Sequence, residues 1–199
     1  MQVIFVDTES TDLHASWGRI LCASFVGLKG TANEKPWTLR GDTRPYMGRR
    51  VADDERLVKG IKEEIEKADI ICTWNGIMHD FPLLNARLAK FGYPPIKSRE
   101  DGGPRHLDMM FYAGGTLMKI GGRRLDTVAK YFKCPHQKTP LDGETWQHAG
   151  TGDREAMDQV VEHCEFDVLV LQDLWPVIAP RVKKWKFSLG DVYNVIDQI

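Results

Sequence analysis

The sequence has few cysteines, no excess of charge of one sign and no long apolar run. Its 199 residues include four cysteines, none in a CxxC pair, so neither a disulfide framework nor a zinc site of the usual spacing is predicted. Lys and Arg number 27 against 28 Asp and Glu, which excludes a globally basic nucleic-acid-binding protein. No run approaches the roughly 18–20 apolar residues that cross a bilayer, so no membrane partner is expected.

What is present is typical of a globular enzyme or binding domain. Hydrophobic residues make up 42% and charged residues 28% of the chain, which predicts one domain over residues 1–199 with a C-terminal tail at 177–199. Acidic residues lie near the N-terminus, where a signal peptide would have a basic region and a long apolar region, so no signal peptide is predicted. Cys22, Cys72 and Cys164 lie in apolar patterns that indicate reduced core thiols, so a cytoplasmic location is expected.

The periodicity predicts an α/β fold. Apolar strands are expected at 2–6, 19–28 and 36–40 as an antiparallel meander, and a further buried strand at 69–74. Helices are expected at 53–68, 81–91, 124–132 and 153–175, the last ending at Pro176. Residues 94–106 are predicted as a loop, 107–113 as a short helix or strand, and 134–152 as irregular. Together these elements predict a mixed central sheet flanked by helices.

Two acidic residues follow the first apolar run, in the segment Asp7-Thr8-Glu9. Alternate side chains of a strand share one face, so Asp7 and Glu9 are expected to project together from its end. Adjacent carboxylates repel unless a cation neutralises them, which indicates a divalent-metal site. A polar turn after a core strand explains the same residues without a metal.

A second group, Asn75-Gly76-Ile77-Met78-His79-Asp80, runs from a predicted strand end into a helix. Taken alone, Asp80 is well explained as the N-cap of that helix and Asn75 as a turn residue. Farther along, His163 and Asp167 lie four residues apart on the predicted long helix and share one face. They are either an exposed ion pair, worth about a few tenths of a kcal/mol, or a base and a metal ligand aimed at a cleft.

The three groups in this order resemble the motifs of the DEDD (DnaQ-like) superfamily of 3′–5′ exonucleases. The chain is most similar to the proofreading exonuclease domains of family B DNA polymerases, over residues 3 to about 175. The resemblance implies a ribonuclease H-like fold and single-stranded DNA as substrate, degraded from its 3′ end to 5′-nucleoside monophosphates. It also implies two cations, held by Asp7, Glu9, Asp80 and Asp167; hard oxygen ligands favour Mg²⁺ or Mn²⁺.

The resemblance assigns roles to further residues. His163 stands where these exonucleases have a tyrosine at this spacing or a histidine one residue farther from the aspartate, so it is the expected base. Lys138 is implied to steady the scissile phosphate, although a solvated loop lysine explains it equally well. Contacts to the terminal nucleotide are expected from five further residues: Ser10, Thr11, Leu13, Asn75 and His79, the last in the place of the usual aromatic residue.

Several alternatives stay open. The sequence does not place contacts to a 2′-hydroxyl, so an exoribonuclease acting on short RNA is an alternative. A catalytically inactive module that binds nucleic acid or a polymerase is another, although all four carboxylates are present. An endonuclease of the same fold matches the motif spacing less well. Since 199 residues leave no room for a polymerase domain, either a stand-alone exonuclease or a proofreading subunit acting in trans is expected, in a bacterial or phage-infected cytoplasm. If the protein proofreads, a replicative DNA polymerase is the expected partner.

Overall fold

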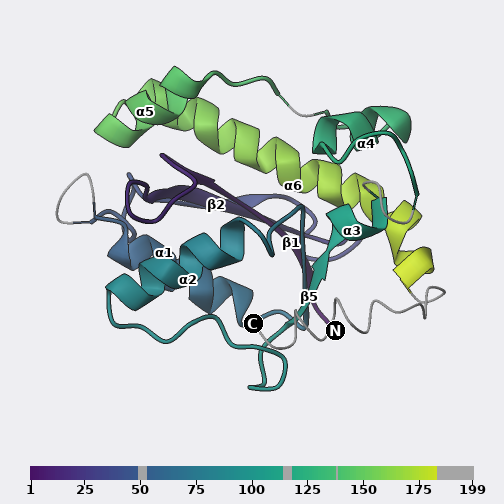
Figure 1. Ribbon diagram of the computed structural model, residues 1–199, viewed down its shortest axis with the longest axis horizontal. Coiled ribbons are helices and arrows are strands. Elements are labelled where there is room, and N and C mark those ends of the chain that lie inside the picture. The colour runs from purple at the N-terminus through teal and green to yellow at the C-terminus, as the bar shows by residue number, and fades with distance from the viewer. Residues whose placement is uncertain (49–52, 114–117, 138, 183–199) are drawn as a thin grey trace.

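A five-stranded mixed sheet forms the centre of the protein (Figure 1). The computed structural model describes residues 1–48, 53–113, 118–137 and 139–182. The strand order is β3-β2-β1-β4-β5, with bounds β1 (Val3–Ser10), β2 (Ile20–Gly27), β3 (Trp37–Arg40), β4 (Ile70–Thr73) and β5 (Arg105–Asp108). β1 pairs antiparallel with β2 and parallel with β4, so the predicted mixed sheet is confirmed.

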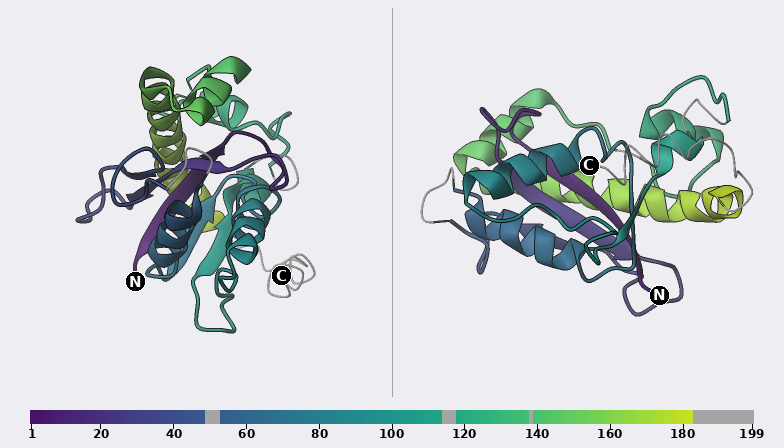
Figure 2. Two further views of the ribbon diagram at one scale, coloured as in Figure 1. Left: turned by 90° about the vertical axis from the view of Figure 1, so that its left-hand side faces the viewer. Right: turned by 60° about the horizontal axis from the view of Figure 1, so that its bottom comes forward.

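Helices cover both faces of the sheet (Figures 1 and 2). The long α6 (Arg154–Val182) lies along one face, where α3 (Met109–Ala113), α4 (Leu125–Tyr131) and α5 (Gly143–Thr151) contact it. The other face is covered by α1 (Glu55–Ile65) and α2 (Asp80–Lys90), whose apolar side chains pack on Ile4, Val6 and Ile71. None of the helices in the described ranges combines the length and apolar character that a bilayer span requires.

The central strand β1 is longer than predicted. It continues through both carboxylates to Ser10, so Asp7 and Glu9 lie within its second half instead of beyond its end. The first half is buried because helices cover both of its faces, and the second half is only half-buried. Pairing with β4 ends at Phe5, because β4 itself ends at Thr73. Beyond Phe5, the edge of β1 toward α2 is therefore available to partners other than a strand.

The prediction that the last helix stops at Pro176 is wrong. α6 continues to Val182 with Pro176 and Pro180 inside it, so residues 177–182 are not a tail. A proline in a helix interior costs about 3 kcal/mol. Leu174 and Ile178 on either side are fully buried in the core, each contributing about 1.5–3 kcal/mol, which offsets that cost. Residues 183–199 lie outside the described residues.

One helix was missed, and one strand was only partly predicted. α5 lies inside 134–152, where Asp142 caps it by accepting the Thr145 N–H at 2.9 Å, and Gly152 ends it with a φ of 98°. Ala149 is the one residue of this helix that is fully buried, so its apolar periodicity is weak. β5 is only four residues long: it begins at Arg105, within the predicted loop 94–106, and its last two residues lie in 107–113, which was predicted as a short helix or strand.

Candidate active site

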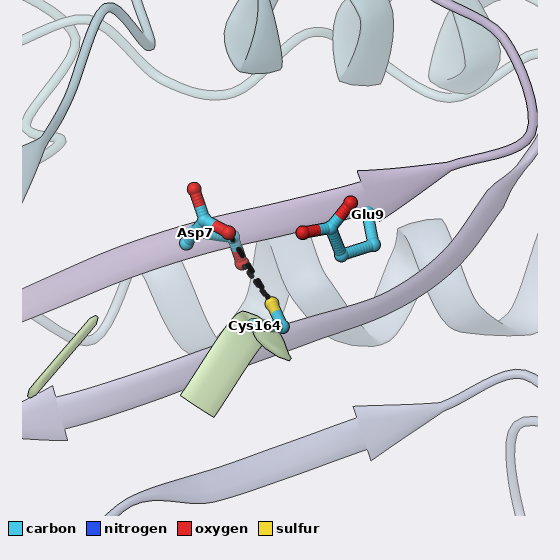
Figure 3. Close-up of side chains that lie close together, drawn as sticks. All are labelled: Asp7, Glu9 and Cys164. Atoms are coloured by element: carbon cyan, nitrogen blue, oxygen red, sulfur yellow. Dashed lines mark hydrogen bonds between the residues drawn. The ribbon is translucent and has the colours of Figure 1, made fainter. Parts of the chain in front are cut away.

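Asp7 and Glu9 face α6 from the second half of β1. Each of Asp7, Glu9 and Cys164 places a ligand atom within 4.8 Å of the other two (Figure 3). Cys164 extends from α6, and its Sγ lies 3.4 Å from the carbonyl oxygen and 3.5 Å from Oδ2 of Asp7. The alternation of the strand thus brings the two carboxylates together, as predicted.

Cys164 is a hydrogen-bond donor in this cluster. Burial, with the neighbouring Cys22 thiol and the nearby carboxylates, raises the pKa of the Cys164 thiol well above its usual value. A protonated thiol donates to Asp7 and is a poor ligand for a hard cation. The oxygen atoms of Asp7 and Glu9 are therefore the donors that fit a metal ion here, and these donors favour Mg²⁺ or Mn²⁺ over Zn²⁺.

His163 and Asp167 reach the same cluster from α6. Both side chains are buried, which contradicts an exposed ion pair. Nε2 of His163 lies 3.8 Å from Oε1 of Glu9 and 4.0 Å from Oδ2 of Asp167. Both distances exceed those of hydrogen bonds. One imidazole nitrogen thus faces two carboxylates, Glu9 from β1 and Asp167 from α6, without a hydrogen bond to either of these two oxygens. The four-residue spacing on the helix is confirmed as the reason that both side chains point to this place.

Two residues that sequence reasoning missed hold this group in place. The Thr139 hydroxyl lies 2.9 Å from Nδ1 of His163. The Trp146 indole N–H donates to Oε2 of Glu9 at 2.7 Å, and its ring meets the His163 ring edge-on at 5.7 Å. Both belong to the segment predicted to be irregular. The capping signals at Asp142 and Gly152 were the sequence features that could have revealed the helix carrying Trp146.

Asp80 approaches β1 from α2. It is the first residue of that helix and His79 occupies the N-cap position, so the N-cap interpretation of Asp80 is wrong. Its Oδ1 accepts the backbone N–H of Thr8 at 3.2 Å and the Thr8 hydroxyl at 2.5 Å. Asp80 thus bonds to the residue between Asp7 and Glu9, on the edge of β1 that β4 has left. Burial raises the pKa of the Asp80 carboxyl, although the Thr8 bonds oppose that shift.

Asp108, the last residue of β5, anchors the turn that leads to Asp80. Its buried carboxylate accepts the N–H groups of Asn75 at 2.8 Å, Ile77 at 3.2 Å and Met110 at 3.1 Å. These bonds hold Asn75 at a φ of 61°, in the left-handed region that asparagine tolerates. Burial raises the pKa of Asp108 to about 6. Asp108 lies in 107–113, which was predicted as a short helix or strand, but no motif marked it as a site residue, because its partners Asn75 and Ile77 are 33 and 31 residues away in the chain.

The remaining predicted residues have different surroundings. The Ser10 hydroxyl donates to the Asp12 carbonyl at 2.9 Å, and Oγ1 of Thr11 accepts the Arg19 N–H at 3.2 Å, so both bonds lie within the loop that follows β1. Leu13 and His79 are exposed at the surface. Lys138 lies outside the described residues, so its predicted phosphate contact stays a prediction.

Comparisons with known proteins agree with this architecture. A family model described as the RNase_H superfamily matches residues 4–178. No match was found when the sequence was compared with those of curated proteins. Among solved structures, the family B DNA polymerase from the hyperthermophilic archaeon Pyrobaculum calidifontis superposes with a TM-score of 0.62 at 16% identity. The alignment covers 88% of this chain and 25% of the polymerase, so the chain spans about a quarter of that protein. The predicted ribonuclease H-like fold is confirmed.

Proposed function

Because the chain belongs to the RNase_H superfamily, we propose that it is a metal-dependent 3′–5′ exonuclease that releases 5′-nucleoside monophosphates from single-stranded DNA. The observation that supports this most is that acidic residues from three elements meet at the second half of β1. Two lie on the strand, one on α6 beside the His163 ring, and one at the start of α2: Asp7, Glu9, Asp167 and Asp80. A site of clustered carboxylates suits the hydrolysis of a charged phosphodiester only with cations bound.

These four carboxylates are the proposed metal ligands. Two Mg²⁺ or Mn²⁺ ions bound to them would polarise the phosphodiester, activate a water and neutralise the leaving 3′-oxygen. Trp146 orients Glu9 through its indole N–H, Cys164 orients Asp7 through its thiol, and Thr8 orients Asp80. Such partners fix the direction of each carboxylate before an ion arrives.

His163 is the proposed base. In the tautomer whose Nδ1 carries the proton, Nδ1–H donates to the Thr139 hydroxyl, and Nε2 is left as the acceptor. Nε2 faces Glu9 and Asp167, so a proton taken from water at this atom would be stabilised by two carboxylates.

The proposed substrate is the 3′ end of single-stranded DNA, and the proposed role is proofreading in replication or repair. The polymerase whose fold resembles this chain belongs to family B, and this likeness supports a replicative DNA polymerase as a partner in trans. RNA is the alternative substrate. A ribose-specific contact would distinguish it, so both polymers belong in the test.

The test is digestion of 5′-labelled single-stranded DNA, and of RNA of the same sequence, with Mg²⁺, Mn²⁺ or EDTA. The wild type is compared with Asp7→Ala and Asp167→Ala. Asp158→Ala is the matched control, because Asp158 is an exposed aspartate on the same helix, paired with Arg40. We expect a metal-dependent ladder that shortens from the 3′ end. Each site variant should lose about 10³-fold or more in rate, since metal stabilisation of the transition state is worth several kcal/mol.

Each outcome decides between the alternatives. A ladder from RNA alone would make the protein an exoribonuclease. Internal cuts instead of a ladder would make it an endonuclease. Absence of cleavage of either polymer by the wild type would overturn the proposal and leave a binding module. Equal loss in Asp158→Ala would show that the effect of the site variants is not specific to the site.

A further inference from the structure

Large apolar side chains are exposed on the two chain segments that directly adjoin the candidate site residues in the sequence. The described residues include six large hydrophobic side chains that are exposed, and three of them lie on the two segments next to the carboxylates. Leu13 (69% exposed) and Trp17 (83%) belong to the loop of residues 11–19 that joins β1 to β2, and Met78 (64%) precedes α2. The 11–19 loop begins directly after Ser10, the end of the strand that carries Asp7 and Glu9.

The 11–19 loop is held by contacts from both sides. The Arg19 guanidinium donates to the carbonyl of Gly150 on α5. From α2, Nη1 of Arg87 donates to the Ala15 carbonyl at 3.3 Å. Inside the loop, the Thr11 N–H donates to the Arg19 carbonyl at 3.1 Å. The Trp17 ring is therefore exposed on a backbone tied to the two helices that also carry Trp146 and Asp80.

Close packing inside the 11–19 loop also indicates that its backbone is held in one conformation. A Cβ at Gly18 would lie 2.5 Å from the Asp12 carbonyl oxygen, so the backbone on either side of Trp17 is folded tightly on itself. The carboxylate of Asp12 accepts the His14 N–H at 2.8 Å. An aromatic side chain on an ordered loop loses little conformational entropy on binding, which favours recognition.

We infer that Trp17 is a stacking platform for an unpaired base of the substrate strand. This rests on the proposed function and adds to it a contact that selects single strands. An indole face stacks on any base, whereas the bases of a duplex are already stacked on each other. Two exposed large apolar side chains in a loop of nine residues are too small a patch for a stable protein interface, which buries about 800 Å² of each partner. A single nucleobase matches the patch better.

The experiment is a double-mutant cycle between Trp17→Ala and the removal of one base at a time. Every protein in the cycle, with or without Trp17→Ala, also carries Asp7→Ala, which prevents cleavage. Fluorescence anisotropy then gives the Kd for labelled single-stranded DNA in Mg²⁺. Abasic sites are placed singly at the first six nucleotides from the 3′ end. Tyr131→Ala is the matched control, because Tyr131 is a 65% exposed aromatic residue on α4.

We expect Trp17→Ala to weaken binding about 5- to 150-fold, the range of one base–aromatic stack. One abasic position should cause a similar loss with Trp17 present and no further loss in Trp17→Ala. Trp17→Phe should restore part of the affinity, and Tyr131→Ala should leave it unchanged. The proposal that Trp17 stacks on a base is overturned if Trp17→Ala does not weaken binding. It is also overturned if Trp17→Ala weakens binding equally with every abasic strand, because no base is then coupled to Trp17. Because cleavage is not measured here, this failure is distinct from failure of the nuclease proposal.

Discussion

The second half of β1 has acidic residues beside both of its faces, and the protein holds the two sets in different ways. Toward α6, Glu9 and Asp167 approach one imidazole nitrogen at 3.8 and 4.0 Å, beyond hydrogen-bond length. Toward α2, Asp80, Asp108 and Asp54 each accept two or more hydrogen bonds from protein donors. The two carboxylates on the α6 side face the same nitrogen of His163, whereas each carboxylate on the α2 side accepts hydrogen bonds from its own set of protein donors.

This difference supports the proposal that the acidic residues on the α6 side bind metal ions, and it indicates that those on the α2 side stabilise the fold. Carboxylates that gather around a point gain most from a cation placed there. Carboxylates that accept several hydrogen bonds instead fix the backbone that carries them. We therefore expect substitutions on the α2 side to change stability, and those on the α6 side to change metal binding and rate. Asp80 belongs to both descriptions, because it is bonded to Thr8 and also lies next to the α6 set along β1.

The largest effect on stability is expected from Arg87→Met. Arg87 of α2 and Asp54, before α1, form a buried ion pair, with Nε of Arg87 at 3.0 and 3.2 Å from the two carboxylate oxygens. Asp54 also accepts the Ile20 N–H at 2.8 Å. Leaving the Asp54 charge buried without its guanidinium should cost about 3–5 kcal/mol. Denaturant unfolding measures the change.

Two further variants show whether this cost belongs to the pair. Lys90→Met, on the exposed side of the same helix, is the control and should cost less than about 0.5 kcal/mol. The double variant Asp54→Leu with Arg87→Met should recover part of the loss, because no charge is left buried. If Arg87→Met cost no more than Lys90→Met, the α2 side would not be the supporting side.

The next largest effect is a pH dependence at Asp108. Its folded pKa of about 6 lies above its ordinary value of 3.8, because burial disfavours the charged form. The stability that this group contributes is fully present below pH 3.8 and is lost as the pH rises through 6. From pH 4 to 7, the wild type should lose about 2 kcal/mol of unfolding free energy relative to Asp108→Asn. Asp101→Asn, in an exposed loop, is the control. A difference that does not vary with pH would contradict the prediction.

The sequence predicted those features of the site that depend on local periodicity. Alternation along a strand brought Asp7 beside Glu9, and helical spacing brought His163 beside Asp167. The contributions of Trp146 and Asp108 depend on contacts between segments far apart in the chain: 137 residues separate Trp146 from Glu9, and 33 separate Asp108 from Asn75. Local patterns carry no signal for such contacts.

The errors in the predicted fold likewise arise because tertiary packing, which local sequence patterns do not report, decides the structure. α6 passes through Pro176 because tertiary packing of its neighbours outweighs a local preference. α5 was missed because almost none of its surface is buried, so it lacks the apolar stripe by which a helix is recognised.

On the α6 side, Trp146→Phe tests whether orientation of a carboxylate matters. The substitution removes the indole N–H that donates to Glu9 at 2.7 Å and keeps an aromatic ring near His163. Loss of a partner that orients a metal ligand typically costs about 10- to 100-fold in metal affinity or rate. Mn²⁺ binding by calorimetry should weaken by that factor with little change in unfolding free energy. Trp17→Phe, on the exposed loop, should leave Mn²⁺ binding unchanged. A variant that unfolds more easily but binds Mn²⁺ normally would place Trp146 among the supporting residues.

The smallest effect is expected from Thr8→Val, which tests the residue that joins the two sides. Valine keeps the shape and strand preference of threonine but removes the hydroxyl that donates to Asp80. One hydrogen bond of this kind contributes about 1 kcal/mol, so the rate should fall about fivefold to tenfold. The Thr8 bond lowers the pKa of Asp80, so its loss should move the acidic limb of the pH–rate profile to higher pH. Thr8→Ser keeps the hydroxyl and should restore both values. If serine and valine behaved alike, the backbone N–H of Thr8 alone would be enough to hold Asp80, and the side chain at position 8 would contribute only packing on the α2 side.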